Sequence, residues 1–376
     1  MKKILIIHTK YSTKGGEDIS VLNEAKLLKE EYDIKEIYFE NTINSILEIL
    51  FLLIGKNFTS VKKVKEALAT FQPDVVYVHN TWFKASTSIF KLLETYQGEV
   101  LIKLHNFRYL CSLKLISNKH ILRDGKYCQG CGTEFKKYVF LSFFYKKNIL
   151  KSFMLFLYSN RYFKYLKNEK FKILVLTDFH KNLFKNITGK KAFTFRNFLP
   201  HQKIIDSKKA NFITYAGRIS EEKGILEMIK VYSEIKNPKY KLNIIGTGPL
   251  LNKLNINNKN IILVGETSHS EVLRVINSSK CVITNTKLFE GQPTLLSEAS
   301  SLGVASIFPD TGGLMEVFED DYPLSFEQFN YKKLKILLES LNDETLEKAG
   351  QSAKKYYDIS LDSKNFLHSF KLLITS

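Results

Sequence analysis

The chain has 376 residues, of which 44% are hydrophobic, and its formal net charge is +18. The length exceeds that of one compact core and predicts two domains, and the apolar share excludes a disordered chain. The charge predicts an anionic partner, which could be a phosphorylated ligand, a nucleic acid or an acidic membrane surface. Four cysteines in a chain of this length do not make a disulfide framework and indicate a reducing cytoplasm. We expect neither a secretion signal nor a membrane span, because the most apolar run, 46–54, is about half the length that crosses a bilayer.

Short apolar runs alternate with helical stretches along the whole chain, a pattern typical of parallel sheets flanked by helices. Strands are expected at 4–8, 34–39, 75–79, 100–105, 173–177 and 192–196, and then at 212–216, 241–245, 261–264, 282–285 and 305–308. Helices are expected at 18–30, 60–71, 86–96, 223–236, 268–278, 293–302, 331–341 and 343–356. Both halves therefore have the pattern of doubly wound α/β domains.

The two domains are expected to divide where Pro200 and a polar stretch follow the last strand of the first half. This places an N-terminal domain at 1–197 and a C-terminal domain at 198–358. The remaining segment, 359–376, has apolar residues at helical spacing, which predicts an amphipathic helix that returns to pack on the N-terminal domain.

Ligands of open α/β sheets bind at the carboxyl ends of the strands, so the loops at those ends are informative. Gly15 and Gly16 follow the first strand, where glycines let a phosphate or sugar approach backbone N–H groups; a flexible turn explains them equally well. In the second half, Arg218 and Lys223 follow a strand and could hold phosphate oxygens in a cleft between the domains. Taken alone, a solvated basic loop is the simpler interpretation of these two cations.

Two glutamates eight positions apart, Glu290 and Glu298, change this balance. Between them Pro293 is expected in the first turn of a helix, whose free backbone N–H groups could bind an anion. Carboxylates on either side of that turn would accept hydrogen bonds from the two sugars of a nucleotide diphosphate-sugar. Alternatively, Glu298 is an ordinary helix residue and Glu290 is a charged residue of a loop.

Together these stretches resemble the donor domain of the retaining GT-B glycosyltransferases of family 4. The matching stretches span about 100 residues: Ala216-Gly217-Arg218-Ile219 to Glu222-Lys223-Gly224, Gly246-Thr247-Gly248-Pro249, Glu290 to Glu298-Ala299, and Thr311-Gly312-Gly313 with Glu316. The first half is similar to the same family through Gly15-Gly16-Glu17-Asp18, His105-Asn106 and Arg196-Asn197, and 104–131 is similar to a bacterial surface-polysaccharide subgroup of group 1 glycosyltransferases. The resemblance implies a GT-B fold, with two Rossmann-like domains facing a cleft.

The resemblance also implies roles for individual residues. Arg218 and Lys223 would bind the donor diphosphate, Glu298 the ribose hydroxyls and Glu290 the transferred sugar, while His105 would lie beside that sugar. The implied catalytic residues are His105, Glu290, Arg218 and Lys223, and the implied donor-binding residues are Gly16, Gly217, Arg218, Lys223, Glu290, Gly291, Pro293, Thr294, Leu295 and Glu298. The family usually has Phe where this chain has Gln292, which leaves the donor sugar open.

No Asp-x-Asp occurs in the chain, so we expect no metal and no cofactor beyond the co-substrate. Two cations and a helix N-terminus could supply the charge stabilisation instead. One CxxC, Cys128 to Cys131, lies near Cys111, His105 and His120 and could form half of a zinc site; reduced, partly buried thiols are the favoured alternative.

Residues 135–172 hold ten Lys or Arg against a single acid, Glu169, and thirteen aromatic residues are interleaved. This composition suits an anionic membrane surface. A pair of helices with aromatics packed inside and lysines in water would give the same pattern. Nucleic acid is not expected as the partner, because no nucleic-acid-binding motif accompanies the charge.

The sequence therefore predicts a retaining hexosyltransferase-type enzyme that moves a sugar from a nucleotide diphosphate-sugar to a glycan. We expect a lipid-linked acceptor in bacterial capsule or O-antigen synthesis, and a cytoplasmic protein peripheral to the inner face of the plasma membrane. The alternatives are a non-catalytic nucleotide-sugar- or membrane-binding protein and a sugar-nucleotide epimerase, both on the GT-B fold. The four intact site residues Arg218, Lys223, Glu290 and Glu298 favour a transferase over a binding protein.

Overall fold

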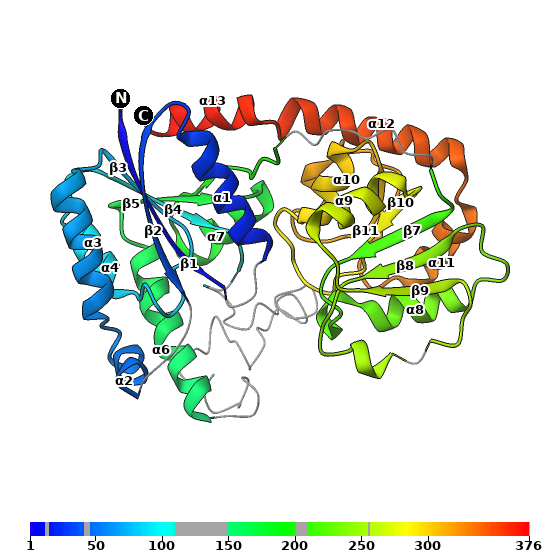
Figure 1. The fold of residues 1–376 in the computed structure, drawn as a ribbon, viewed down its shortest axis with the longest axis horizontal. Coiled ribbons are helices and arrows are strands. Elements are labelled where there is room, and N and C mark those ends of the chain that lie inside the picture. The colour runs from blue at the N-terminus through cyan, green and yellow to red at the C-terminus, as the bar shows by residue number, and fades with distance from the viewer. Residues whose placement is uncertain are drawn as a thin grey trace. The chain divides into compact units, whose positions relative to one another are not determined.

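The computed structural model of the chain describes residues 1–11, 15–40, 46–107, 109, 149–200, 209–254 and 256–375. The chain forms two compact units. Unit 1 comprises Met1–Phe198 and Phe366–Ser376, and unit 2 comprises Leu199–Asn365. Each unit is built on a six-stranded parallel sheet with helices around it (Figure 1), which confirms the predicted α/β class and its two doubly wound halves.

The sheet of unit 1 has the strand order β2-β1-β3-β4-β5-β6. Its strands are β1 (Lys3–Lys10), β2 (Asp33–Glu40), β3 (Val75–Val78), β4 (Glu99–Leu104), β5 (Phe171–Val175) and β6 (Phe193–Thr194). Its helices are α1 (Gly16–Leu28), α2 (Ile46–Ile54), α3 (Phe58–Phe71), α4 (Ser88–Glu94), α6 (Ile149–Leu166) and α7 (Asp178–Thr188), and α13 (Ser363–Leu373) joins them from the C-terminus.

One face of the unit 1 sheet is covered by α1 and α13. Ile4 and Ile6 of β1 share a buried cluster with Val21 of α1 and with Phe366 and Phe370 of α13. Figure 1 shows α3 and α4 on the other side of the strands from α1. Because helices cover both faces, β1 is apolar at consecutive positions rather than at alternate ones.

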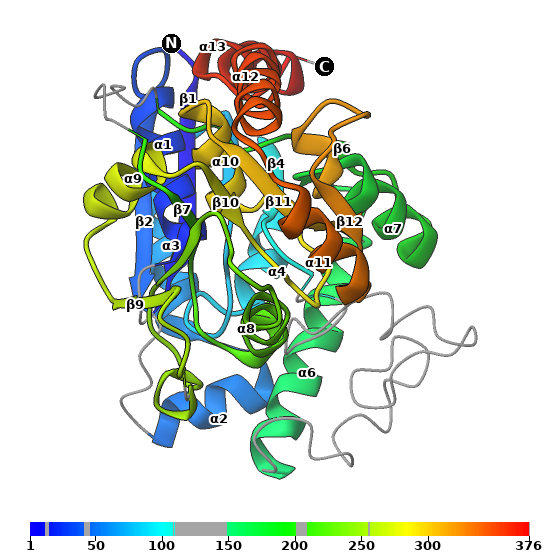
Figure 2. The ribbon, with the colours of Figure 1, turned by 90° about the vertical axis from the view of Figure 1, so that its right-hand side faces the viewer.

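The sheet of unit 2 has the strand order β12-β11-β10-β7-β8-β9, and Figure 2 labels each of these strands except β8. Its strands are β7 (Phe212–Ala216), β8 (Lys241–Ile245), β9 (Ile261–Gly265), β10 (Cys281–Ile283), β11 (Ala305–Asp310) and β12 (Ser325–Glu327). Its helices are α8 (Ile225–Ser233), α9 (His269–Ser278), α10 (Thr294–Ser301), α11 (Tyr331–Ser340) and α12 (Asp343–Ser360). The reversal of strand order at β7 and β10 is the position where doubly wound folds bind ligands.

Among the described α-helices and strands, four were not predicted. In α2 nearly every residue is apolar, so the sequence shows no helical periodicity there. In α7 the first turn follows Thr177, whose side chain accepts a hydrogen bond from the His180 N–H, and the predicted strand had included this cap. Strand β12 has only three residues, too few for an alternating pattern. Helix α6 lies in the basic stretch 135–172, for which a pair of helices was one of two interpretations.

Candidate active site

In unit 2, the loops that follow β7 and β8 are hydrogen-bonded to each other. The Gly217 N–H donates to the carbonyl oxygen of Ile245 (3.0 Å), and the Ile219 N–H donates to that of Thr247 (2.9 Å). Gly246 has a φ of +133°, and a Cβ at this position would lie 2.0 Å from the Gly217 carbonyl oxygen. Only glycine permits so close an approach, so this pair of glycines fixes the loop that carries Arg218.

The turn that carries Lys223 is attached to the loop after β10. The side chain of Asn285 donates to the carbonyl oxygen of Gly224 (2.9 Å), and the Lys287 N–H donates to that of Glu222 (2.9 Å). Gly224 has a φ of +66°, and a Cβ there would lie 2.0 Å from the Asn285 carbonyl oxygen. Two loops far apart in sequence are thereby brought into contact at the carboxyl ends of β7 and β10.

Lys223 and Glu290 are brought together by these loops, and their side chains form an ion pair. The Thr286 hydroxyl donates to the same carboxylate oxygen of Glu290 (3.1 Å), and the Gly313 N–H donates to the Glu290 carbonyl oxygen (2.9 Å). Both charged side chains are only partly buried. Because an ammonium group has three donors, Lys223 can keep its bond to Glu290 while it donates to a phosphate oxygen.

Arg218 is exposed, with 67% of its side chain accessible. Its guanidinium lies 3.9 Å from the carboxylate of Glu222, and an exposed pair at this distance contributes little stability. The Tyr215 hydroxyl donates to the Arg218 carbonyl oxygen (2.8 Å). Burial and the charges of Glu290 and Glu222 raise the pKa of Tyr215, so its hydroxyl stays protonated and holds the loop.

Glu298 lies inside α10 and is paired with a residue that sequence reasoning missed. The Nε2 atom of His269 lies 2.6 Å from Oε1 of Glu298, whose side chain is almost fully buried. His269 begins α9, directly after the N-cap Ser268, and is half exposed. A single histidine at a predicted helix start carries no sequence signal; only the packing of α9 beside α10 reveals the pair.

Helix α10 begins one residue later than predicted. Pro293 is its N-cap residue, with extended backbone angles (φ −74°, ψ 126°), rather than part of the first turn, and Gly291 precedes it in the loop. Proline has no side-chain acceptor, and this N-cap makes no side-chain hydrogen bond. The first-turn N–H groups of Thr294 and Leu295 are therefore available to an anion.

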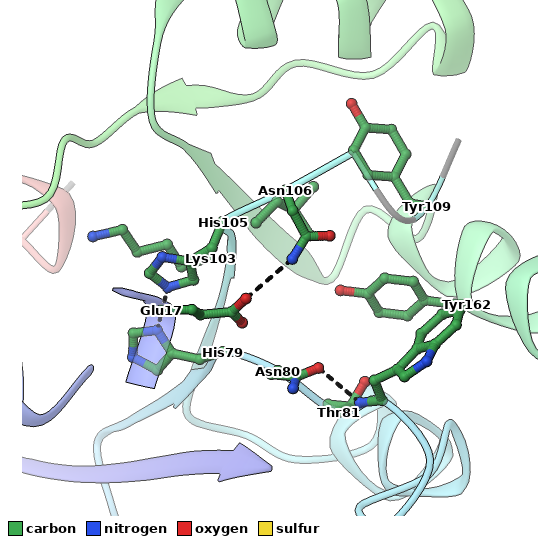
Figure 3. A pocket seen from close by; sticks show the side chains of 11 residues that line it. Glu17, His79, Asn80, Thr81, Lys103, His105, Asn106, Tyr109 and Tyr162 are labelled. Carbon is green, nitrogen blue, oxygen red and sulfur yellow. Dashed lines mark hydrogen bonds between the residues drawn. The ribbon is translucent and has the colours of Figure 1, made fainter. Parts of the chain in front are cut away.

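In unit 1, His105 lines a small cavity beside the carboxyl ends of β3 and β4 (Figure 3). Its volume is about 20 Å³, which is room for one water molecule rather than a sugar ring. Asn106 donates to Oε2 of Glu17 (3.1 Å), and His79 Nδ1 lies 2.9 Å from His105 Nε2. The side chains that line the cavity therefore include the imidazoles of His79 and His105, the amide of Asn106 and the carboxylate of Glu17.

Gly16 begins α1, on a turn that Asp18 holds. The Asp18 carboxylate accepts hydrogen bonds from the Gly15 N–H (3.0 Å) and the Tyr11 N–H (3.3 Å), and it lies 2.8 Å from His8 Nε2. Burial alone raises the pKa of Asp18, but these hydrogen bonds outweigh burial and lower it below the ordinary value. The ionised carboxylate fixes the backbone from which Gly16 was predicted to approach a ligand.

Several predicted features lie outside the described residues: Cys111, Cys128, Cys131 and His120, and the part of the basic stretch at 135–148. In the part of the chain that the structure describes, no group of three or more His, Cys, Asp or Glu side chains could hold a metal ion. Among the described helices, none is both long and apolar enough to cross a membrane. Cys281 is a free thiol buried in β10, and burial raises its pKa.

Residues 199–356 match the model of a protein family described as glycosyl transferases group 1. No curated protein sequence matches the chain. Among solved structures, the chain is similar to Anabaena Alr3699/HepE in complex with UDP and glucose, with 12% identity, full coverage of both chains and a TM-score of 0.68.

Two further solved structures are similar over nearly the whole chain. Sucrose-phosphate synthase from Thermosynechococcus elongatus has 13% identity, coverage of 99% of this chain and 98% of that chain, and a TM-score of 0.69. The apo form of the lipopolysaccharide outer core galactosyltransferase WaaB has 15% identity, coverage of 99% of both chains and a TM-score of 0.62. The fold is therefore GT-B, and the family match over residues 199–356 supports a glycosyltransferase.

Proposed function

Because residues 199–356 match the glycosyl transferases group 1 family, we propose that this chain is a retaining family 4 enzyme that transfers a sugar from a nucleotide diphosphate-sugar to a glycan. One arrangement in unit 2 carries the proposal. The Lys223–Glu290 pair, the exposed Arg218 and the uncapped start of α10 all belong to the loops and helix start that follow β7 and β10. A UDP-sugar is the first donor to test, since the HepE structures hold UDP or UDP-glucose.

In the proposed reaction, the bond between the donor sugar C1 and the diphosphate oxygen breaks. A bond from C1 to the acceptor oxygen forms on the same face of the ring, so the anomeric configuration is retained. The acceptor proton passes to the leaving phosphate oxygen. Negative charge grows on the diphosphate as it leaves, and Arg218, Lys223 and the N–H groups of Thr294 and Leu295 would stabilise it.

The carboxylates would orient the donor. Glu290 would accept hydrogen bonds from the transferred sugar, and Glu298 from the ribose, with His269 holding the Glu298 carboxylate in place. In unit 1, Gly16 and His105 would contact the acceptor or the transferred sugar.

A donor screen tests this function directly. Purified protein would be incubated with UDP-, GDP-, ADP- and dTDP-sugars and with membrane extract, and free nucleotide diphosphate would be measured. We expect release with one donor only, dependent on the membrane extract, and a product whose anomeric configuration matches the donor by NMR. Binding of all donors without release would favour a non-catalytic binding protein, and conversion of the donor sugar without an acceptor would favour an epimerase.

We propose that the reaction needs no metal, because Arg218, Lys223 and a helix start occupy the role that a divalent cation has in Asp-x-Asp enzymes. Transfer should persist unchanged in EDTA. Loss of activity that manganese or magnesium restores would contradict this. Loss that only zinc restores would instead indicate a metal role for the cysteine segment.

We propose a lipid-linked acceptor at the cytoplasmic face of the plasma membrane, as in the synthesis of bacterial surface polysaccharide. Support comes from a corner of unit 1 where Leu50 and Ile54 of α2 and Phe58 of α3 are 49%, 53% and 62% exposed, with exposed Lys56 between them. Arg161 of the basic helix α6 donates to the Leu53 carbonyl oxygen (2.7 Å) and ties this corner to α6. Exposed apolar side chains next to cations suit an anionic lipid surface.

A further inference from the structure

Thr286, in the loop after β10, connects the framework of unit 2 to the carboxylate of Glu290. Thr286 is almost fully buried. Its hydroxyl oxygen accepts a hydrogen bond from the Leu288 N–H (3.2 Å), and its hydroxyl donates to Oε1 of Glu290 (3.1 Å). Because a backbone N–H can only donate, the hydroxyl proton is left for the carboxylate, and the direction of both bonds is determined.

The backbone on both sides of this contact is fixed. The side-chain amide of Gln328, which follows β12, donates to the Thr286 carbonyl oxygen (3.2 Å). The Gly313 N–H donates to the Glu290 carbonyl oxygen (2.9 Å), and a Cβ at Gly312 would lie 2.6 Å from that same oxygen. With both backbones held, the freedom that remains is rotation within the Glu290 side chain.

The two carboxylate oxygens of Glu290 have different surroundings. Oε1 accepts from the Thr286 hydroxyl and from the ammonium of Lys223. Oε2 has no hydrogen-bond or ion-pair partner among the described residues, and the protein does not enclose it. The side chain of Glu290 is 23% accessible. One oxygen is therefore held by the protein, and the other is available to a ligand.

Thr286 and Lys223 hold Oε1 in different ways. The side chain of Lys223 is 31% accessible, and its ammonium rotates on a flexible four-carbon stem, so it sets no single direction for the carboxylate. The hydroxyl of Thr286 is carried on a stiff, branched side chain and is already engaged with the Leu288 N–H. When a phosphate draws the ammonium of Lys223, Thr286 still holds Oε1.

We propose that Thr286 is a positioning residue that fixes the rotation of the Glu290 carboxylate, so that Oε1 stays on the protein and Oε2 faces the donor sugar. The contact of Glu290 with the transferred sugar rests on the proposed function, whereas the two hydrogen bonds of the Thr286 hydroxyl do not. A carboxylate held in this way accepts a sugar hydroxyl from one direction only, which orients the sugar ring for transfer.

Crystal structures of the ligand-free full chain test the orientation directly. Thr286→Val keeps the shape of the side chain and removes the hydroxyl, whereas Thr286→Ser keeps the hydroxyl. We expect the Glu290 carboxylate to turn away from residue 286 in the valine variant and to keep its wild-type orientation in the serine variant. Thr286→Ala removes the same hydroxyl and gives the same comparison if the valine variant does not fold. A carboxylate that superimposes on that of the wild type without the hydroxyl would overturn the proposal, because Lys223 alone would then set its orientation.

The consequence for the donor is measured by titration calorimetry. The probes are the nucleotide-sugar found in the donor screen, with UDP-glucose tried first, and its free nucleotide diphosphate. Thr286→Val should raise the Kd of the nucleotide-sugar by about tenfold and that of the free diphosphate by less than about threefold, since a hydrogen bond to a charged group is lost only on the sugar side. Thr286→Ser should recover most of the affinity. The matched control is Thr345→Val, at a partly buried threonine of α12, which should bind both probes as the wild type does.

A double-mutant cycle separates positioning from a general loss of loop structure. In a Glu290→Ala background there is no carboxylate to orient, so Thr286→Val should change the Kd of the nucleotide-sugar by less than about twofold. An equal loss of affinity in both backgrounds, or no loss in either, would overturn the positioning role. If the wild type neither binds nor consumes any donor, the proposed function fails, and the crystal structures still decide whether Thr286 orients Glu290.

Discussion

At the scale of single residues, the charged groups of unit 2 are held by partners distant in sequence. Lys223 is separated from Glu290 by 67 positions, and His269 from Glu298 by 29. The first pair joins the loops after β7 and β10, and the second joins the start of α9 to the inside of α10. A ligand that binds there meets groups already in place, so the loss of one of them should affect transfer more than folding.

The first prediction concerns Arg218 and Lys223. Arg218→Ala and Lys223→Ala should each lower kcat/KM strongly, because loss of a group that stabilises transition-state charge costs on the order of 3 kcal/mol, or about 10²-fold. The matched control is Lys348→Ala, an exposed lysine of α12 in the same unit, which should retain full activity. Steady-state kinetics and circular dichroism check both. Near-normal turnover by a folded Arg218→Ala, Lys223→Ala double variant would refute the predicted diphosphate site.

The second prediction concerns His180 and the dependence of stability on pH. His180 is fully buried, both ring nitrogens are without a hydrogen-bond partner among the described residues, and burial lowers its pKa to about 3. The ordinary pKa of an unfolded histidine is about 6.5, so below that pH only the unfolded chain binds the proton. The free energy of unfolding should therefore fall as the pH falls from about 6.5 towards 3, by about 1.4 kcal/mol per pH unit from this group.

His180→Phe should remove this part of the pH dependence and keep the parallel stacking on Tyr109, whose ring plane is 3° from that of His180. Urea unfolding at pH 6.5, 5.5 and 4.5 measures the difference. The chain has one tryptophan, Trp82, which is buried in unit 1, so its fluorescence follows the unit that contains His180. If the free energy of unfolding changes with pH equally in the wild type and the variant, His180 takes up its proton in the folded state.

At the scale of elements, the corner between α2 and α3 exposes apolar side chains that the core of unit 1 does not use. Helix α2 has one charged residue, Glu48, which is paired with Lys84. Leu50 and Ile54 of α2 are about half exposed and lie on one helical face one turn apart. Exposed apolar residues scattered singly are normal, but a group of them beside cations indicates a surface that binds something.

The third prediction is that this corner binds anionic lipid. Leu50→Ser, Ile54→Ser and Phe58→Ser together should weaken co-sedimentation with anionic vesicles by at least about tenfold, since each such side chain contributes about 1.5–3 kcal/mol when fully buried. Ile336→Ser with Ile359→Ser, at similarly exposed positions in unit 2, is the control and should bind as wild type does.

The association of the wild type should weaken at high salt, because each basic residue near the surface contributes roughly 1 kcal/mol electrostatically. Equal binding of the triple variant and the wild type to anionic vesicles, or no binding by the wild type, would remove the corner as the lipid contact. A triple variant that becomes monomeric, where the wild type is dimeric, would assign the corner to a second copy of the chain.

At the scale of the whole molecule, the last helix of the chain completes the core of the first unit. Phe366 and Phe370 of α13 lie in the same buried cluster as β1, β3 and α1. The ammonium of Lys103 lies over the rings of Phe366 and Phe195, 5.5 Å and 4.7 Å from their centroids. The same ammonium forms a fully buried ion pair with Glu24 of α1 (2.6 Å). The C-terminal segment is therefore required to bury a charge pair as well as apolar surface.

The fourth prediction is that Phe370→Ala destabilises unit 1 by about 3–5 kcal/mol, the usual cost of removing a buried phenylalanine. Leu372→Ala on the same helix, at a position 56% exposed, is the matched control and should change stability by less than about 0.5 kcal/mol. Urea unfolding followed by Trp82 fluorescence reports unit 1 in both variants. An equal effect of the two substitutions would show that α13 is not part of the unit 1 core.

From the sequence alone, the α/β class, most strands and helices, and the resemblance of the second half to glycosyltransferases could be recognised. Apolar periodicity depends on which faces of an element are buried, and motifs such as Gly217-Arg218 and Glu290 to Glu298 are local in the chain, so both can be recognised without a structure. The sequence of α2 is almost uniformly apolar and β12 has only three residues, so neither shows a periodic pattern from which it could be predicted.

Which side chains meet can be seen only in the folded structure. The order of the parallel strands is not encoded in periodicity, yet it places β3 beside β4 and β10 beside β7. The contacts of His79 with His105 and of Lys223 with Glu290 follow from that order, and the contact of His269 with Glu298 follows from the packing of α9 against α10. Each contact joins residues tens of positions apart, so it exists only after the chain has closed the intervening loop and buried both elements against one sheet.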